Sequence, residues 1–406
     1  MKEISKQLIH FLDTQVSSKL HHIPHIDISN ESTDMLSAIF HKIKEAEREF
    51  KTAIIHEKWI NFENTKIPKG EDYNYSPEIA KTEIEKIAKF GCIFTFKIGS
   101  RDIQVSIVFE NKMQNNTKYC DDALKRIFIW LYVSTHYASA NCSRKLNIYL
   151  YLTELKKTLP SLHEDINQEH ANSGFTTTCN TISEIHIYRE EEWFKVLIHE
   201  TFHNMGLDFS GMDNSKINQC ILSIFPIKTT RKCFFESYCE MWAEIINVMF
   251  ISYFSTKTRT IEAFIKKTIK MLKKEQEFSL FQCAKVLKNL GLSYTDLYYT
   301  TSQAEHARLY KYKEKTPIFA YFVLKSMMMF FVGDYIHWCA IHNRGSLQFT
   351  HFEKMLTEYC AFIREHYQRP EYLHSIKTVE NMFMRQKNQK DTSMILQTLR
   401  MSLHEM

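Results

Sequence analysis

The chain has 406 residues, of which 44% are hydrophobic, and its formal net charge of +5 is small for this length. Such a chain can bury a large core in one domain or in two closely packed ones. The small number of glycines and prolines argues against a fibrous or disordered protein. The basic residues are spread along the chain, so the charge pattern does not call for nucleic acid as a partner.

In chain order, residues 1–75 are expected to form a helical N-terminal region and a linker. Residues 76–255 are expected to hold a small mixed sheet and the candidate site, and residues 256–406 a helical region that completes the cleft. The fold class predicted is α+β, with this small core embedded in a mostly helical chain. The expected sheet elements are a hairpin at 92–109 that turns at Gly99 and Ser100, and strands at 145–152 and 183–189.

The longest apolar segment, 318–341, carries Lys325, Asp334 and His337 in its interior. Charged and polar residues at such positions argue against a transmembrane segment and favour a buried helix of the core. We therefore expect no membrane-spanning segment.

Ten cysteines are dispersed along the chain, and no C-x-x-C pair occurs. The N-terminus, Met1 to Gln7, lacks the apolar core of a signal peptide. We therefore expect reduced, mostly buried thiols and a cytoplasmic protein that is not secreted.

The most informative stretch is the predicted helix 190–206, which contains the pattern H-E-x-x-H as His199, Glu200 and His203. Two histidines four residues apart lie on the same side of a helix, so their ring nitrogens can share a zinc ion. Glu200 is then positioned to reach a water at the metal. The acidic residues 190–192 suit the start of the helix, and Gly206 suits its end. A surface helix could carry the same residues without a metal.

A second predicted helix, 234–247, carries Glu236, Glu240 and Glu244 on one stripe at spacings of four. Three like charges so close together repel one another unless they are solvated or a cation lies beside them. A solvated face and a metal site both explain this stripe.

Several strings in this part of the chain resemble the gluzincin zinc metallopeptidases, and more closely the metallopeptidases encoded by large nucleocytoplasmic DNA viruses. The resemblance covers roughly residues 170–350 and leaves the first third of the chain unmatched. The metzincin pattern does not fit, because Phe209 stands where its third histidine would be. The strings that carry the resemblance are Asn172 to Thr176, Glu191 to His203, Gly206 to Ser210, Glu236 to Asn247 and Phe319 to Lys325.

This resemblance implies zinc as the cofactor, with His199, His203 and Glu240 as ligands. It assigns Glu244 to hold a zinc-bound histidine by hydrogen bonding. Glu236 is the alternative third ligand, and Glu240 would then take the supporting role. By the same resemblance, a tyrosine from a later helix assists the reaction, and Tyr321 is the candidate. If the protein is viral, its location is the host cytoplasm or the virion.

The strand at 183–189 directly precedes the zinc helix, where a zincin-like fold places the edge strand that lines its cleft. An extended peptide or protein substrate could add a strand to that edge. Asn172, Ser173 and Gly174 would then lie at the cleft, with the glycine allowing close backbone approach. An ordinary loop and strand would give the same pattern.

The function that follows is hydrolysis of peptide bonds by a metal-activated water, with Glu200 as the general base. Two alternatives stay open. The chain could be a catalytically silent protein of this fold that binds a host or virion partner, or a structural helical protein with a fortuitous motif. Substrate preference and oligomeric state cannot be read from the sequence.

Overall fold

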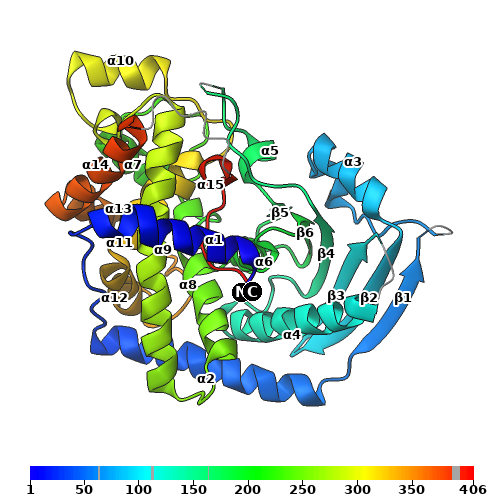
Figure 1. The fold of residues 1–406 in the computed structure, drawn as a ribbon. Coiled ribbons are helices and arrows are strands. Elements are labelled where there is room, and N and C mark those ends of the chain that lie inside the picture. Colours follow the sequence, from blue (N-terminus) through cyan, green and yellow to red (C-terminus); the bar gives the residue numbers. More distant parts are fainter. Residues whose placement is uncertain (63–64, 111–113, 163, 386–393) are drawn as a thin grey trace.

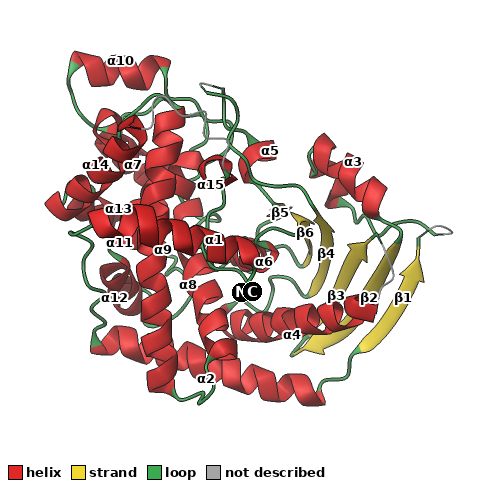
Figure 2. Ribbon diagram, in the orientation of Figure 1, coloured by secondary structure: helices red, strands yellow, loops and turns green. Residues whose placement is uncertain are grey.

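The computed structural model describes residues 1–62, 65–110, 114–162, 164–385 and 394–406. A curved sheet of six strands lies beside a larger body of helices (Figure 1, Figure 2). The chain is therefore α+β and mostly helical, which confirms the predicted fold class.

The sheet is mixed, with strand order β1-β2-β3-β4-β6-β5. The central strands β3, β4 and β6 are parallel, and the remaining pairs are antiparallel. The predicted hairpin is confirmed, and Gly99 takes the positive φ of +57° that its turn requires. The strands are β1 (His56–Asn61), β2 (Phe90–Ile98), β3 (Arg101–Phe109), β4 (Lys145–Thr153), β5 (Gly174–Thr176) and β6 (Ile182–Arg189).

Two expectations about the sheet are wrong. Residues 56–60, expected to be helical, form most of β1, because they pair with β2 along its whole length. The strand at 183–189, expected at the edge, is β6 and lies inside the sheet, because the three residues of β5 pair with it on its outer side. So short a strand gives almost no alternation of polar and apolar residues to recognise.

Helices cover both faces of the sheet. Helix α4 (Gln114–Tyr137) packs on the inner face within the main hydrophobic core, whereas α3 (Glu78–Ile87) covers part of the outer face with a small core of its own. Helix α6 (Trp193–Asn204) contacts β5 and β6 on one side and α8 (Glu236–Ser255) on the other. The motif helix is therefore enclosed between the sheet and the helical body.

The helical body is built from both ends of the chain, and one continuous core joins it to the inner face of the sheet. The π-helical turn Phe319–Leu324 leads directly into α11. The other main helices are α1 (Glu3–Phe11), α2 (Asn30–Thr52), α5 (Gln168–Ala171), α7 (Ser215–Ile224), α9 (Ile261–Asn289), α10 (Ser302–Tyr310), α11 (Lys325–Phe330), α12 (Val332–His342), α13 (Glu353–His366), α14 (Pro370–Arg385) and α15 (Met394–Gln397).

The apolar segment 318–341 forms mostly buried helices that bend at Phe331; Lys325 is buried, whereas Asp334 and His337 are exposed. Within the described residues, no single helix is long and apolar enough to cross a membrane. The pair Phe319–Phe330 and Val332–His342 meets that test only when taken together, and its two helices bend by 93°.

Residues 398–406, which we call the C-terminal strap, run through the interior of the protein. Leu399, Ser402 and Leu403 are fully buried, and the amide of Lys2 donates a hydrogen bond to the carbonyl of Glu405. The two ends of the chain therefore meet beside α6 (Figure 1). The strap begins with a short backbone pairing of Thr398 and Leu399 with residues 157–158, and buried side chains hold its remainder: the Glu275 carboxylate, for example, accepts from the amide of Leu403 at 3.0 Å.

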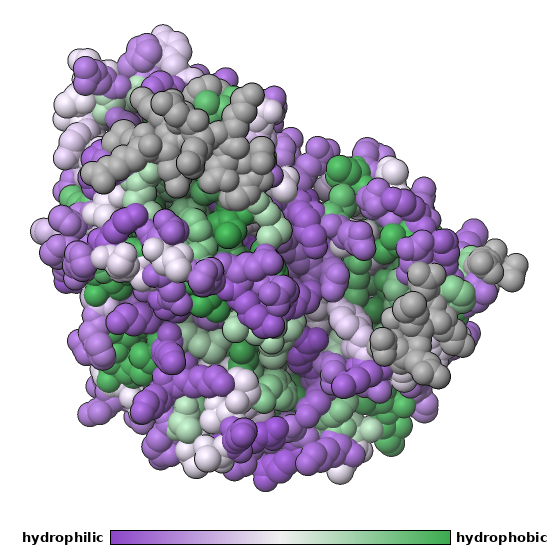
Figure 3. Space-filling view, viewed as in Figure 1, coloured by the Kyte–Doolittle hydropathy of each residue, from purple (hydrophilic) through white to green (hydrophobic). Residues whose placement is uncertain are grey.

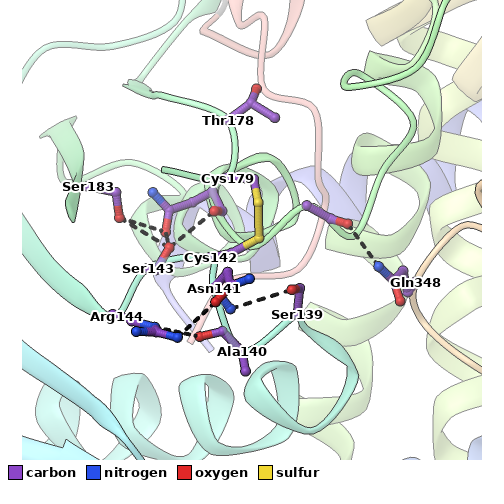
Figure 4. Close-up of a disulfide and its surroundings, with 12 residues drawn as sticks. Ser139, Ala140, Asn141, Cys142, Ser143, Arg144, Thr178, Cys179, Ser183 and Gln348 are labelled. Atoms are coloured by element: carbon purple, nitrogen blue, oxygen red, sulfur yellow. Dashed lines mark hydrogen bonds between the residues drawn. A yellow bond between two sulfur atoms is a disulfide. The ribbon is translucent and has the colours of Figure 1, made fainter. Parts of the chain in front are cut away.

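The expectation of reduced cysteines is wrong for four of them. Cys142 forms a disulfide with Cys179, and Cys220 forms one with Cys360. The first joins the loop after α4 to the turn between β5 and β6 (Figure 4). Disulfides persist in oxidising environments, so the cysteines no longer support the expectation of a reducing compartment.

Candidate metal centre

The motif helix begins later than the sequence suggests. Glu192 precedes α6 with a left-handed φ of +60°, so the acidic residues 190–192 lie outside the helix. Because Glu191 and Glu192 are buried, their carboxylates pair with cationic side chains: Glu192 pairs with Lys157, and Glu191 pairs with Arg400. The predicted end of the helix is confirmed, because Gly206 follows it with a φ of +64°.

The stripe of glutamates on α8 faces α6 and is not solvated. Glu236, Glu240 and Glu244 lie at successive turns, and Glu240 and Glu244 are 3% and 0% exposed. A buried carboxylate requires a cation or several donors. The three glutamates meet this requirement in three different ways.

Three ligand atoms converge between the two helices. Nε2 of His199, Nε2 of His203 and Oε2 of Glu236 lie 3.0 to 3.2 Å from one another. Zinc bonds of about 2.0–2.2 Å in a tetrahedral arrangement place ligand atoms about 3.4 Å apart, a few tenths of an ångström more than is observed. These three residues therefore form a group that fits a small divalent cation.

This geometry corrects two assignments. Glu240, assigned as the third ligand, instead places Oε1 2.9 Å from Nδ1 of His199, on the side of the ring away from the cluster, and accepts a hydrogen bond from Lys195. Glu244, assigned to hold a histidine, is one turn further along and pairs with Lys325 at 2.7 Å. The alternative arrangement, Glu236 in the cluster and Glu240 behind a histidine, agrees with the structure.

Both histidines have a carboxylate behind the ring. Nδ1 of His199 faces Glu240, and Nδ1 of His203 lies 2.6 Å from Oδ2 of Asp208. Asp208 is itself fixed by the Ser210 hydroxyl, which donates to Oδ1 at 2.8 Å. A carboxylate at Nδ1 fixes the ring orientation and leaves Nε2 free to bind a metal. The two Nε2 atoms point toward Glu236, as metal ligands would.

Charge in the cluster is strongly coupled. Burial by itself lowers the pKa of His199, but Glu236 and Glu240 outweigh it and raise that pKa to about 9. Burial raises the pKa of Glu236, and the two histidines nevertheless lower it to about 2. Carboxylates thus hold positive charge on the imidazoles. A divalent cation in the cluster would take over this charge and displace the protons.

A second group of potential ligands lies on the Nδ1 side of the His203 ring. Nδ1 of His203, Oδ2 of Asp208 and Sγ of Cys239 lie close enough together to hold a cation. The Cys239 thiol donates to Asp208 at 3.3 Å, and burial raises its pKa far above the usual range. A neutral thiol that donates to Asp208 supports the orientation of His203.

A narrow cavity adjoins the cluster, and Glu200 lines it together with His199 and Tyr321. Burial, the largest cause, raises the pKa of Glu200, while the two histidines act against this rise. A carboxylate whose pKa is shifted toward neutrality is suited to accept and return a proton. Burial and the nearby carboxylates also raise the pKa of Tyr321 far above its usual range, so its hydroxyl stays protonated.

The predicted cleft residues Asn172, Ser173 and Gly174 line the same cavity opposite α6. A Cβ atom on Gly174 would lie 2.8 Å from the backbone oxygen of His186 and 3.4 Å from Cγ of Glu200. A glycine is therefore required here. The close approach that it permits is to the chain's own strand and helix.

A larger groove leads to this cavity along β5. It has a volume of about 410 Å³ and shares Asn172 and Gly174 with the cavity. Tyr75 on the approach to α3 and Gln168 on α5 border it, and the surface is hollowed between these parts, with mainly hydrophilic residues around the hollow (Figure 3). The edge strand β5 thus lines a groove that adjoins the cavity at Glu200 through Asn172 and Gly174.

No protein-family model, no curated protein and no solved structure matches this chain. What the site can do therefore has to be argued from its own geometry.

Sequence reasoning missed three residues that build the site. Asp208 lies behind the His203 ring and supports it. Lys195 lies one turn before His199 and holds Glu240, and Lys157 lies on a loop between β4 and α5. The spacing of Lys195 from His199 could have placed it on the motif side of the helix. No sequence signal marks Lys157.

Proposed function

We propose that this protein is a zinc-dependent peptidase in which His199, His203 and Glu236 hold the metal. The observation that carries the proposal is the convergence of the three ligand atoms within 3.2 Å, with Glu200 beside them in a cavity. Two histidines and one carboxylate leave a position open on the metal, which is typical of catalytic and not structural zinc sites.

The roles of the residues follow from their positions. Zinc held there would lower the pKa of a water and polarise a carbonyl group. Glu200 accepts the proton of the attacking water and returns it to the leaving amine, a task that its raised pKa favours. Tyr321, protonated and in the same cavity, donates a hydrogen bond to the oxygen on which negative charge develops.

The substrate in this proposal is an extended peptide or a segment of a protein. Its backbone pairs with the open edge of β5 and follows the groove toward Glu200. Asn172 lies where groove and cavity meet and is held there by Thr316, whose hydroxyl donates to its side-chain oxygen at 2.7 Å.

The test begins with elemental analysis of the purified chain and of the double variant His199→Ala with His203→Ala. One zinc per chain that is absent from the double variant is expected. A peptide library is then incubated with the zinc-loaded protein and with Glu200→Gln, and cleavage that depends on Glu200 supports the proposal. A folded wild type that takes up no zinc overturns it. Bound zinc without any cleavage would instead favour the silent binding protein.

A further inference from the structure

Two buried lysines line the cavity that adjoins the histidine cluster. Lys157 and Lys195 are both 2% exposed, and both line the cavity that His199 and Glu200 also line. Lys195 is also near enough to Lys157 to act on its charge. Burying two ammonium groups side by side is costly unless anionic groups compensate for it.

These two lysines differ from the other two buried lysines of the described residues. Lys285 donates to two backbone oxygens, and Lys325 donates to Glu244 and to the backbone of Met401. Lys157 has a single oxygen partner, Glu192, and Lys195 has a single oxygen partner, Glu240, within the part of the chain described. An ammonium group has three donors. Both cavity lysines therefore have donors to spare.

Each of the two glutamates that pair with these lysines also has further partners. The Glu192 carboxylate also accepts from the amide and the hydroxyl of Ser402, both at 2.6 Å. Glu240 also faces His199 at 2.9 Å. Each carboxylate thus shares its oxygens among several groups.

A third donor that lines the cavity lacks a hydrogen-bond partner among the described residues. The hydroxyl of Ser173 is buried, the residue is 3% exposed, and no hydrogen-bond partner for it exists among the described residues. Ser173 lines the same cavity as the two lysines. A buried hydroxyl left unpaired in a finished fold marks a position where a ligand atom can be accommodated.

We infer that this cavity contains a subsite for a carboxylate of the substrate, bound by Lys157, Lys195 and Ser173. A carboxylate accepts several hydrogen bonds at once, and charge-assisted bonds of this kind are the strong ones. The inference rests on the proposed function and specifies its substrate: the residue beside the cleaved bond carries a carboxylate. The source is either an acidic side chain or a free C-terminus.

The size of the cavity limits what enters. It leaves about 20 Å³ in this structure, which is room for about one water molecule. Met401 of the C-terminal strap forms part of its wall. A carboxylate is larger than one water molecule, so it can enter only if the side chains that line the cavity move apart.

Two pairs of peptides test the inference with the zinc-loaded wild type. In the first pair, one peptide has glutamate and the other glutamine beside the cleaved bond. In the second pair, one peptide ends in a free carboxylate and the other in an amide. A preference of about 10- to 100-fold in kcat/KM for the carboxylate member is expected in one of them, since hydrogen bonds to charged groups contribute about 1.5–3 kcal/mol. The pair that shows it identifies the source of the carboxylate.

Variants connect the preference to the residues. Ser173→Ala removes an unpaired hydroxyl and is expected to reduce the preference by about 2- to 10-fold without loss of stability. Lys157→Met is expected to abolish it, with the thermal unfolding temperature and zinc content checked in parallel. The matched controls are Ser106→Ala, which removes another buried unpaired hydroxyl outside the cavity, and Lys285→Met, which removes a buried lysine outside it.

The outcomes separate the two proposals. Cleavage of both members of each pair at equal rates overturns the carboxylate subsite and leaves the peptidase intact. The subsite is also overturned if Ser173→Ala leaves the preference unchanged, which is the result expected of the control Ser106→Ala. A zinc-loaded protein that cleaves no peptide overturns the proposed function, and the subsite falls with it.

Discussion

The two walls of the cavity are built in different ways. One wall is formed by α6 and α8, whose histidines and glutamates repeat every fourth residue and face one another. The other wall is formed by irregular segments that are far apart in the sequence, namely the loop at Asn172 to Gly174, Lys157 and the C-terminal strap. The helical wall places the groups that would hold the metal and move the proton, whereas the irregular wall shapes what reaches them.

The largest effects are expected from the glutamate stripe of the helical wall. Glu236→Gln should abolish stoichiometric zinc binding, because it removes a ligand atom. Glu240→Gln should weaken zinc binding by about 10- to 100-fold, as is usual for a residue that orients a ligand. Glu244→Gln should leave it unchanged. Zinc affinity measured by competition with a chelator checks this order, and an equal loss for Glu236→Gln and Glu244→Gln would contradict it.

Glu200→Gln should separate binding from chemistry within the same wall. Zinc content is expected to stay at the wild-type level, because Glu200 is not part of the ligand group. The value of kcat should fall by about 10²- to 10⁴-fold, the usual contribution of a general base. Zinc analysis and peptide cleavage on one preparation give both quantities. Loss of zinc together with activity would show that Glu200 is part of the metal site.

The two disulfides provide a test of the irregular wall. Cys142–Cys179 closes a separation of 37 residues beside β5 and packs on Gly206 at the end of α6. Cys220–Cys360 closes a separation of 140 residues and joins α7 to α13. On loop entropy alone, their removal should lower the free energy of unfolding by about 4 and about 5 kcal/mol, respectively.

The loss of activity in the two disulfide variants should follow the opposite order to their loss of stability. Replacing Cys142 and Cys179 by serine is expected to reduce kcat/KM more, because that disulfide fixes the turn that follows β5. The Cys220 and Cys360 double variant is the matched control: it is less stable but keeps its activity below its unfolding temperature. Denaturant unfolding and peptide cleavage measure the two properties. If the less stable of the two variants is also the less active one, the irregular wall has no special role in activity.

The smallest expected effect concerns the strap that carries Met401. Burial lowers the pKa of His404 to about 4, although the Met271 carbonyl and Glu244 act against it. The unfolded chain takes up a proton near pH 6.5, whereas the folded chain does so only near pH 4. The free energy of unfolding should therefore fall by about 3 kcal/mol as the pH falls from 6.5 to 4, and not further below that.

His404→Gln should remove this contribution. The difference in unfolding free energy between wild type and variant, measured by denaturant titration at pH 7 and pH 4.5, isolates it from all other titrating groups. A difference that does not change with pH would mean that the strap accommodates the charged imidazole.

Much of the helical wall was predictable from the sequence. The spacing of His199, Glu200 and His203 places them on one side of a helix whatever that helix packs against, because the helical repeat is local. The same repeat put the three glutamates on one stripe, and Gly206 marked the end of α6. The hairpin β2–β3 was likewise predictable from its alternating side chains and its glycine turn.

What each glutamate does was decided only by the tertiary structure. A stripe fixes the direction of its members, but how far α8 is shifted along α6 determines which one meets the histidines. Glu236 does, and Glu240 is left to Lys195 and to the back of His199. Residues 190–192 show the same limit: they read as a helix start, but partners such as Lys157 and Arg400 hold them outside the helix.

The irregular wall was almost invisible to sequence reasoning for one physical reason. Its members are brought together by hydrogen bonds and ion pairs across long separations, such as Glu192 with Ser402 and Lys157 with Leu399. No periodicity connects residues that are 200 positions apart. The sequence by itself determined the groups that could bind a metal, and the packing of the chain decided which of them meet and what surrounds them.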